Sequence, residues 1–561
     1  MKITGSEAVI KSLLEEGVDV AFGYPGGSIM PVYDAIYKYQ KELKHVLVRH
    51  EQGAVHAAEG YAAATGKVGV CIATSGPGAL NLMTGIADAM MDSIPLVAIT
   101  GQVAEPLVGT DAFQEADVIG VTTPITKWNH QVTRAVDIPH TIAIAFHIAR
   151  TGRPGPVVVD ITKNAMFETT EFSYNKQVNV RGFKPNTDPN PHQIRLAAEL
   201  INNAKAPLML VGHGVTLAQA EKELLAFAEK AQIPAASTLL GLSAFPVDHP
   251  LYAGFLGMHG NYAPNMLTNQ ADVIIAVGMR FDDRVTGRLA DYAKQAKIIH
   301  IDIDPAELNK NVKAEILIVA DAKLALQELT TKTKKATRPE WLAQFAKFHK
   351  EEKKQIIDPE TKPAKGAITM AEIIDTISRE TRGDAVVVTD VGQNQMKSAR
   401  YYRFKKNRSF ISSGGAGTMG FGLPAAIGAK FGQPDREVIA VSGDGGFQMT
   451  IQELGTVMQE NLPVKMVIMN NHYLGMVRQW QELFFDKRYS AVDIGQPDFV
   501  AVAKAYKISG EEVTKRSQLK EAITRMLQYQ GPYLLNIFVE REENVFPMIP
   551  TGAAVDEIRL K

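Results

Sequence analysis

The stretch Val438-Ile439-Ala440-Val441-Ser442-Gly443-Asp444-Gly445 sets the fold class, because an apolar run ends in a turn that carries one carboxylate. A second apolar run, residues 464–469, ends in Asn470-Asn471. The segment between them predicts a helix that begins with a capping box of Thr450 and Glu453. Its apolar residues share one face: Ile451, Leu454, Val457 and Met458. A strand–helix–strand unit of this kind is parallel, so both strands end at the same edge of one sheet.

Asp444 and Asn471 therefore follow two successive strands at the edge where ligands of parallel sheets bind. Two oxygen ligands suit Mg²⁺, which takes few protein ligands and completes its octahedron with phosphate and water. Either motif alone is also typical of a plain turn or a helix cap. The two in this order and at this interval predict a magnesium–diphosphate site.

Length and composition indicate a large enzyme with several domains. The chain has 561 residues, more than one core accommodates, with 45% hydrophobic and 22% charged residues. A formal net charge of -1 argues against a nucleic-acid-binding protein, and the charged clusters at 332–335 and 349–354 are expected to be solvated. No apolar run approaches the roughly 20 residues of a membrane span. The single cysteine, Cys71, is predicted to be a buried strand thiol rather than a nucleophile, which fits a cytoplasmic protein.

Short β-branched runs alternate with helical patterns, which predicts an α/β fold of three doubly wound parallel-sheet domains. The first set of strands is expected at 18–22, 45–48, 68–73, 95–100 and 156–161. The second is expected at 207–212, 271–277, 297–303 and 316–320, and the third at 385–390, 409–412, 438–441, 464–469 and 533–539. Polar linkers are expected at 177–191 and 331–365. The predicted domains are 1–176, 192–330 and 366–545, followed by a tail, 546–561, that covers a site or a subunit contact.

The Gly443–Asp444–Gly445 and Asn470–Asn471 segments resemble the motif with which thiamine-diphosphate enzymes hold the coenzyme through Mg²⁺. In that family a backbone carbonyl just after the asparagine is a further metal ligand, and Tyr473 occupies the matching position. The resemblance implies two thiamine-diphosphate-type domains that flank a Rossmann-like central domain. It also implies further residues that contact the coenzyme: Gln393, Asn394, Met419, Gly443, Gly445, Gly475 and Met476.

Glu51 is the candidate for the carboxyl group that these enzymes place against N1′ of the coenzyme. Standing alone, a glutamate that follows a strand and opens a helix is typical of a helix N-terminus. Its neighbours, Gly23-Tyr24-Pro25-Gly26-Gly27 and Ser75-Gly76-Pro77-Gly78, match the first domain of the family and favour the catalytic role. Because the family pairs this glutamate with the metal motif of another subunit, the resemblance implies a homodimer or larger assembly with the active site at the interface.

Longer strings narrow the resemblance to the acetohydroxyacid synthases, also called acetolactate synthases. They include residues 109–117, 126–129, 280–287 and 474–481. In that family a hydroxyethyl carbanion made from pyruvate attacks a second pyruvate or 2-ketobutyrate, a step of valine, leucine and isoleucine biosynthesis. The family often has a separate small regulatory subunit.

The same resemblance suggests roles around the reacting centre. Gly27 and Gln114 match residues that line it, and Lys163 matches a lysine near the substrate channel, although a surface lysine is an equal alternative. Phe113, Met476 and Trp480 match substrate-contacting residues, and an indole wall at Trp480 favours 2-ketobutyrate. Met419 matches the residue that bends the coenzyme. Ordinary packing is the alternative for Met419 and Trp480.

The middle domain contains no Gly-x-Gly-x-x-Gly fingerprint, because Gly212-His213-Gly214 is too short. The resemblance nevertheless implies FAD that serves no net redox purpose. Matching positions are Arg153, Gly212, Gly214, Met258, His259, Gly278, Arg280, Asp302 and Asp321. Arg153 and Arg280 are expected to neutralise the flavin diphosphate, and Asp302 to accept a ribose hydroxyl.

Two departures from the family pattern bear on cofactor affinity and rate. Asn394 and Lys397 stand where the family usually has histidine and tryptophan, and Ile161-Thr162-Lys163-Asn164 replaces Leu-Pro-Lys-Asp. Two other functions stay open. One is a catabolic FAD-independent acetolactate synthase or a pyruvate oxidase. The other is a non-catalytic nucleotide-binding regulatory protein, against which Glu51, Asp444 and Asn471 argue.

Overall fold

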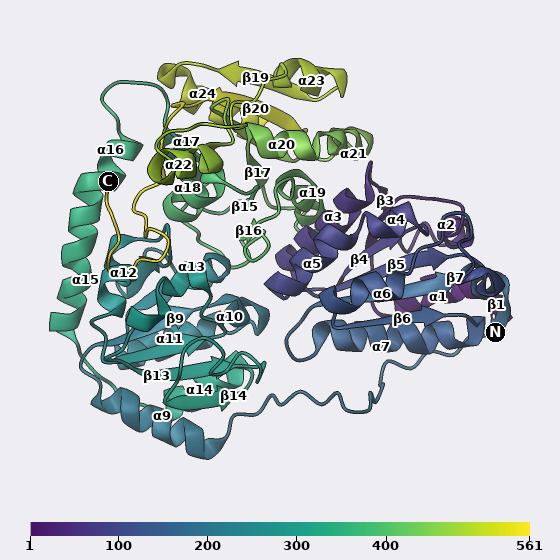
Figure 1. Cartoon of the computed structure of the whole chain (residues 1–561), viewed down its shortest axis with the longest axis horizontal. Helices are drawn as coiled ribbons and strands as arrows, with labels where there is room; N and C mark the ends of the chain where they lie inside the picture. The colour runs from purple at the N-terminus through teal and green to yellow at the C-terminus, as the bar shows by residue number, and fades with distance from the viewer. Residues whose placement is uncertain (1) are drawn as a thin grey trace.

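A computed structural model describes residues 2–561 and contains three six-stranded parallel sheets flanked by helices (Figure 1). The N-terminal sheet has the order β3-β2-β4-β5-β7-β6. Its strands are β2 (Val20–Gly23), β3 (Lys44–Leu47), β4 (Gly69–Ala73), β5 (Leu96–Gln102), β6 (Trp128–Val132) and β7 (Pro156–Thr162). A separate antiparallel pair, β1 (Lys2–Thr4) and β8 (Thr169–Glu171), joins the beginning and the end of this domain. The predicted α/β class is confirmed.

The C-terminal sheet repeats the N-terminal topology. Its strand order is β16-β15-β17-β18-β20-β19, so the six strands, counted in chain order, take the same places as in the N-terminal sheet. Its strands are β15 (Val386–Thr389), β16 (Phe410–Ser412), β17 (Val438–Gly443), β18 (Lys465–Asn470), β19 (Ser509–Val513) and β20 (Tyr533–Phe538). The middle sheet differs, with the order β11-β10-β9-β12-β13-β14. Its strands are β9 (Pro207–Val211), β10 (Ala235–Ser237), β11 (Tyr252–Phe255), β12 (Val273–Val277), β13 (Lys297–Asp302) and β14 (Ile316–Val319). This is the dinucleotide-fold order, so the Rossmann-like prediction is also confirmed.

Helices cover the faces of all three sheets (Figure 1). In the N-terminal domain they are α1 (Gly5–Glu15), α2 (Met30–Lys38), α3 (Glu51–Thr65), α4 (Pro77–Leu80), α5 (Met83–Asp92), α6 (Val118–Thr122), α7 (Ile138–Arg150) and α8 (Lys163–Phe167). In the middle domain they are α9 (Pro191–Asn203), α10 (His213–Leu217), α11 (Glu221–Ala231), α12 (Tyr262–Thr268), α13 (Asp283–Thr286) and α14 (Ala322–Lys332). The C-terminal domain has α17 (Met370–Glu380), α18 (Gln393–Tyr401), α19 (Gly422–Gly432), α20 (Asp444–Met449), α21 (Leu454–Glu460), α22 (Gly475–Phe484), α23 (Phe499–Ala505) and α24 (Arg516–Gln528).

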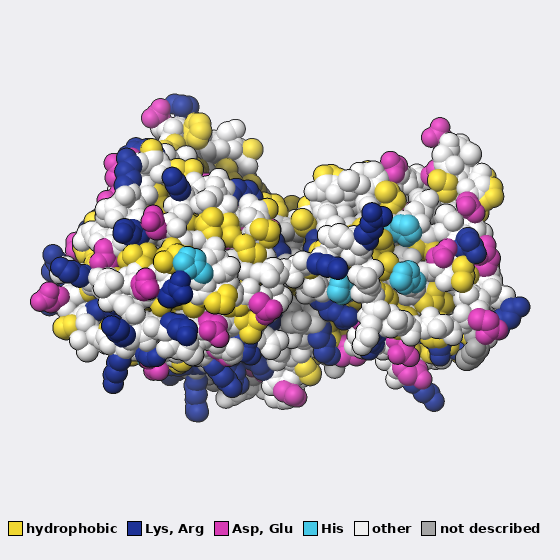
Figure 2. Space-filling view, turned by 90° about the horizontal axis from the view of Figure 1, so that it is seen from below, with side chains coloured by type: hydrophobic (Ala, Val, Ile, Leu, Met, Phe, Trp, Pro, Cys, Tyr) yellow, Lys and Arg dark blue, Asp and Glu magenta, His cyan; other side chains and the backbone are white. Residues whose placement is uncertain are grey.

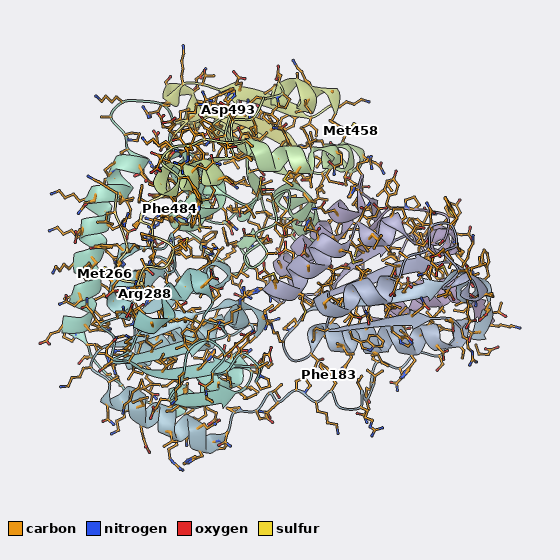
Figure 3. The ribbon with its side chains drawn as sticks, viewed as in Figure 1. Phe183, Met266, Arg288, Met458, Phe484 and Asp493 are labelled. Carbon is orange, nitrogen blue, oxygen red and sulfur yellow. The ribbon has the colours of Figure 1, made fainter. Side chains whose placement is uncertain are left out.

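The two predicted linkers have different structures. The first has no helix or strand from residue 172 to residue 190 and passes below the N-terminal domain, where Phe183 lies under the Lys127 ammonium (Figure 3). The second is mostly helical: α15 (Pro339–Glu352) continues through a π-helical turn into α16 (Asp358–Thr361). The charged cluster at 349–354 is not fully solvated, because the Glu352 carboxylate is buried against Arg400 at 2.6 Å.

The predicted helix between the two metal-motif strands is broken, and its capping box is wrong. A 3₁₀ turn separates α20 from α21. The Thr450 hydroxyl instead donates to the Gly420 carbonyl, and the Glu453 carboxylate accepts hydrogen bonds from the backbone N–H groups of Arg49 and His50. Met458 is exposed on α21 rather than buried with its predicted face (Figure 3).

The N-terminal and C-terminal domains share one hydrophobic core, and α3 packs directly against α19. Small residues permit this close approach, since a Cβ at Gly60 would overlap the Ala425 backbone and one at Gly428 the Ala57 carbonyl. On the face in Figure 2, acidic and basic side chains are interspersed over both lobes, as the balanced net charge leads one to expect. Among residues 2–561, no helix combines the length and the apolar character needed to cross a membrane.

Gly428→Ala is expected to destabilise the protein by about 1–3 kcal/mol, because the α3 backbone cannot move aside without disturbing the shared core. Alanine's better helix propensity offsets only a fraction of this cost. Thermal unfolding of the purified variant measures the effect. Gly495→Ala is the control, because a Cβ at that position meets no atom within 4 Å. Equal midpoints for the two variants would contradict the tight helix crossing.

Candidate functional site

Asp444 and Asn471 lie side by side because β17 and β18 are paired neighbours, with Gly443 opposite Met469. The buried Asp444 carboxylate accepts hydrogen bonds from the backbone N–H of His472 and the side chain of Gln496, both at 2.8 Å. Burial raises the pKa of this carboxyl to about 6, although these hydrogen bonds act in the opposite direction. The Asn471 Oδ1 atom accepts from the Tyr473 N–H at 3.1 Å. The pair offers oxygen donors at one sheet edge, which fits a hard cation such as Mg²⁺.

The first turn of α18 lies beside this pair. Gln393 is buried, and its amide contacts Asn471, Gln479 and the Glu543 carbonyl. Asn394 donates to the carbonyls of Asp390 and Val441, both at 2.9 Å. Both side chains are therefore held by protein groups.

Met419 lies beside the metal motif, since its methyl group would contact a Cβ at Gly445 at 3.9 Å. The turn that carries Met419 is held by Asp390, whose buried carboxylate accepts hydrogen bonds from the N–H groups of Gly420 and Gly422. Sequence reasoning missed Asp390 and Gln496. The position of Asp390 directly after β15, which matches that of Asp444 after β17, was the available signal.

Glu51 opens α3 at the corresponding edge of the N-terminal sheet. Its side chain is 9% exposed, accepts a hydrogen bond from the Asn81 amide at 3.0 Å, and faces Gly78. Burial and the nearby Glu51 charge raise the pKa of Tyr33 well above its usual range. Among residues 2–561, no hydrogen bond or ion pair joins Glu51 to Asp444 or Asn471.

The other predicted residues of this domain surround the same edge. Gln114 has a positive φ of 60°, and its carbonyl packs against Gly76 in the turn after β4. Gly27 is exposed, and a Cβ there would meet no atom within 4 Å. Phe113 is 88% exposed, and Lys163 begins α8 directly after β7. The structure thus brings Glu51, Gly27 and Gln114 to one sheet edge and leaves Phe113 pointing into solvent.

A cavity of about 720 Å³ lies where the three domains meet. Its walls include eight of the nine residues predicted to hold FAD: Arg153, Gly214, Met258, His259, Gly278, Arg280, Asp302 and Asp321. The ninth, Gly212, lies directly behind the wall, because its Cβ would overlap the Gly278 carbonyl. Gly212 and Gly278 directly follow β9 and β12, the strands at which the order of the middle sheet reverses. Met476 and Trp480 of α22 line the far side of the same cavity.

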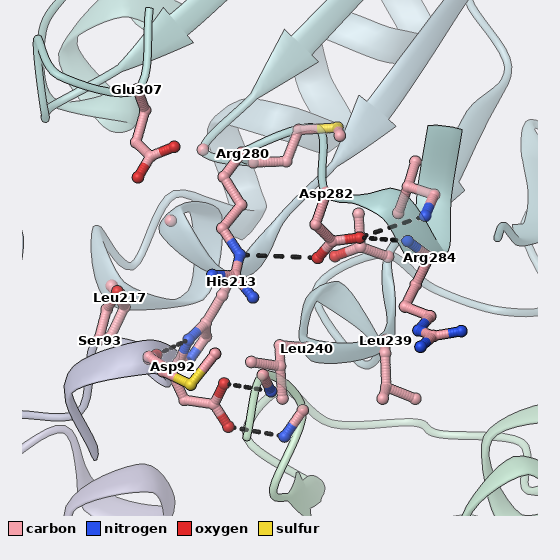
Figure 4. A pocket seen from close by; sticks show the side chains of 18 of the residues that line it. Asp92, Ser93, His213, Leu217, Leu239, Leu240, Arg280, Asp282, Arg284 and Glu307 are labelled. Carbon is pink, nitrogen blue, oxygen red and sulfur yellow. Dashed lines mark hydrogen bonds and ion pairs between the residues drawn. The ribbon is translucent and has the colours of Figure 1, made fainter. Parts of the chain in front are cut away.

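Charged groups on the cavity wall are partly paired already. Arg280 lies 3.6 Å from Asp282 and extends toward Asp92, as Figure 4 shows. Arg153 pairs with Glu307 at 2.7 Å. Burial raises the pKa of the Asp302 carboxyl to about 6. Asp321 caps α14 through the N–H groups of Lys323 and Leu324, so one of its oxygens has a structural role.

Asp444 and Asn471 lie at one edge of the C-terminal sheet, and Glu51 lies at the matching edge of the N-terminal sheet. The domain between these two in the sequence has the Rossmann strand order. This combination of fold and site defines a thiamine-diphosphate enzyme. Family models agree along the chain. The N-terminal thiamine pyrophosphate binding domain matches residues 3–121, the central domain matches 194–329, and the C-terminal binding domain matches 390–537.

Comparison with individual proteins identifies the family within this class of enzymes. The chain is 46% identical to the acetolactate synthase large subunit of Corynebacterium glutamicum over 100% of its own length and 90% of that protein. It is 45% identical to the probable acetolactate synthase large subunit of Methanocaldococcus jannaschii, with 99% and 95% of the two chains covered. It is also 45% identical to the isozyme 2 large subunit of Escherichia coli, with 99% of each covered. The chain therefore belongs to the acetolactate synthase large-subunit family of thiamine pyrophosphate enzymes.

Proposed function

We propose that this chain catalyses the formation of 2-acetolactate from two pyruvates and of 2-aceto-2-hydroxybutyrate from pyruvate and 2-ketobutyrate, in branched-chain amino-acid biosynthesis. The observation that carries the proposal is the pairing of Asp444 with Asn471 on adjacent strands, in a chain that matches acetolactate synthases along its whole length. Product analysis tests it, with pyruvate alone and with added 2-ketobutyrate, each with and without FAD. Absence of both acetohydroxyacids under all four conditions would refute it.

The residues of the C-terminal site fit Mg²⁺ and a diphosphate. The Asp444 carboxylate, the Asn471 Oδ1 atom and the Tyr473 carbonyl are the proposed metal ligands, because hard oxygen donors suit this ion. Gly443, Gly445 and Gly475 leave room for the coenzyme, and a Cβ at Gly475 would strike the Gln393 and Asn471 amides. Met419 packs beside Gly445, where it supports the bound coenzyme.

Thiamine diphosphate supplies the electron sink for decarboxylation when it is bound. The role of the protein is to hold the coenzyme and to activate it. Glu51, held by Asn81, would hydrogen-bond N1′ of the bound coenzyme through its second oxygen, the interaction that would favour loss of the C2 proton. Gly27 and Gln114, at the same sheet edge as this carboxyl, would line the reacting centre, and Lys163 would guide the anionic substrate. Phe113, Met476 and Trp480 contact the second substrate.

Exposed apolar side chains near Glu51 support a homodimer with shared active sites. Tyr24, Met30, Leu80 and Phe113 are all more than a third exposed, and Met449 is exposed beside the metal motif. Large exposed apolar groups commonly mark interfaces. Mixing Glu51→Gln chains with Asp444→Asn chains tests this arrangement. Hybrid dimers regain one intact site if Glu51 and Asp444 come from different chains, and regain nothing if each site lies within one chain.

The central cavity supports FAD as a bound, non-redox cofactor. Its size, the strand reversal behind Gly212 and Gly278, and the arginines 153 and 280 suit a dinucleotide with a diphosphate. A yellow protein that makes acetolactate without consuming O₂ would support this reading. Robust electron transfer to an acceptor would instead favour the pyruvate oxidase alternative, and full activity without FAD would favour the catabolic enzyme.

Arg280→Met is expected to weaken FAD binding roughly ten- to hundredfold, since a hydrogen bond to a charged group contributes about 1.5–3 kcal/mol. Titration of the apoprotein with FAD, followed by flavin fluorescence, measures the change. Arg288→Met is the matched control, because Arg288 pairs with Asp291 outside the cavity (Figure 3). Equal losses in the two variants would argue against a flavin diphosphate at Arg280.

A partner subunit and a cellular location complete the proposal. The relatives are named large subunits, which supports a separate small regulatory subunit for this chain as well. A cytoplasmic location fits the single cysteine, which is free and fully buried in β4 as the sequence predicted.

A further inference from the structure

Glu543, in the segment that follows β20, connects α17, α18 and α22. One oxygen of its carboxylate lies 2.7 Å from the Lys397 ammonium, and the other accepts from the Met370 N–H at 3.0 Å. Its backbone carbonyl accepts hydrogen bonds from the Gln393 amide at 2.7 Å and from Arg478 at 2.8 Å. The next residues continue the attachment, since Val545 and Gln479 exchange two hydrogen bonds.

Lys397 fixes Glu543 from inside the protein. Its side chain is fully buried on α18, and its ammonium lies 2.7 Å from both Glu543 and Glu360. Burial acts to lower the pKa of Lys397, but the Glu543 and Glu360 carboxylates together raise it above its usual range. The lysine is therefore charged, and removing it leaves two partly buried carboxylates without their cation.

The hydrogen bonds at Glu543 determine which way two buried amides point. A carbonyl oxygen only accepts, so Gln393 must turn its NH₂ group toward Glu543, where it also donates to Gln479 at 3.1 Å. The Gln393 oxygen then faces the Asn471 side chain and accepts from its NH₂ group at 3.4 Å. Asn471 is left with its oxygen on the opposite side, toward Tyr473 and the Asp444 edge.

We propose that Lys397 is a positioning residue for the metal site: by holding Glu543, it fixes the amide of Gln393 and so turns the oxygen of Asn471, not its nitrogen, toward the cation. Gln393 and Lys397 are one turn apart on α18, so both reach Glu543 from the same helix face. The inference rests on the proposed role of Asp444 and Asn471 as ligands of Mg²⁺.

Lys397→Met tests the inference by coenzyme binding rather than by turnover. Thiamine diphosphate is titrated into the apoprotein by calorimetry at a series of Mg²⁺ concentrations. The Mg²⁺ concentration that gives half-maximal binding is expected to rise at least about tenfold, in the range known for residues that orient metal ligands. Gln393→Glu, which cannot donate to Glu543, is expected to shift the same quantity. The double variant should show less than the sum of the two effects, because both act through one chain of contacts.

Lys465→Met is the matched control, because Lys465 is an equally buried lysine on β18 whose ammonium, within residues 2–561, donates only to the carbonyls of Tyr529 and Gly531. It should lower thermal stability without changing the Mg²⁺ requirement. If Lys397→Met also leaves that requirement unchanged within twofold, the positioning role is overturned. If Lys397→Met is insoluble, the Mg²⁺ requirement of Glu543→Gln is measured instead, and a value within twofold of the parent overturns the positioning role. A parent protein that binds the coenzyme without Mg²⁺ would instead overturn the metal site itself.

Discussion

Asp444→Asn is expected to weaken magnesium-dependent binding of thiamine diphosphate by at least about 100-fold, equivalent to about 2.8 kcal/mol. The substitution keeps the size of the side chain but removes the negative charge next to the cation. It also replaces one carboxylate oxygen by an NH₂ group. The His472 N–H and Gln496 both donate to Oδ2, and the Gly445 N–H donates to Oδ1, so in either orientation the NH₂ group of the asparagine faces a donor at this buried site.

Calorimetric titration of the coenzyme with and without Mg²⁺ measures this loss. The control is Asp160→Asn on β7, an equally buried carboxyl that accepts hydrogen bonds from Thr100, Gln102 and Gln131. It should reduce stability without changing the Mg²⁺ dependence. An Asp444→Asn protein that binds the coenzyme like the parent would remove the carboxylate from the metal site.

Sequence pattern predicted the strands that end in functional residues because those strands are buried on both faces and read as continuous apolar runs. Strand β6 was missed, although its first residue, Trp128, lies in a recognised motif. It is an edge strand with polar and half-buried residues, so its composition does not distinguish it from a loop. The edge strand β19 escaped prediction in the same way, whereas β10 and β11, which were also missed, are short strands that are mostly buried.

The predictions were wrong for several charged residues, because contacts with distant segments of the chain determine whether these residues are buried. The helix α15 was read as linker because of its lysines and glutamates, although Trp341 and Phe345 at helical spacing gave a usable signal. The Thr450–Glu453 pair has the sequence of a capping box, but Glu453 is taken by backbone donors more than 400 positions away. No local rule could place Lys397 in the interior, since its two carboxylate partners lie in separate segments of the chain.

Glu51→Gln is expected to slow C2 deprotonation of the bound coenzyme and acetolactate formation by at least roughly tenfold, about 1.4 kcal/mol, while coenzyme binding is retained. The reason lies in the contact with Asn81. Because the Asn81 NH₂ group donates to this side chain, a glutamine would keep its oxygen there and present its own NH₂ group to N1′. An amide still fills the pocket and forms a hydrogen bond, but it cannot hold the proton that a carboxyl shares with the ring.

Exchange of the C2 proton with deuterium, followed by NMR after acid quench, separates this step from later ones. The control is Glu59→Gln, two turns further along α3. Burial raises the pKa of the Glu59 carboxyl well above its usual range, and a glutamine of the same size keeps a polar contact with His56. That variant should exchange at the parent rate. Equal rates for Glu51→Gln and the parent would exclude Glu51 from activation of the coenzyme, whereas loss of coenzyme binding in Glu51→Gln would show that this carboxyl holds the ring rather than activates it.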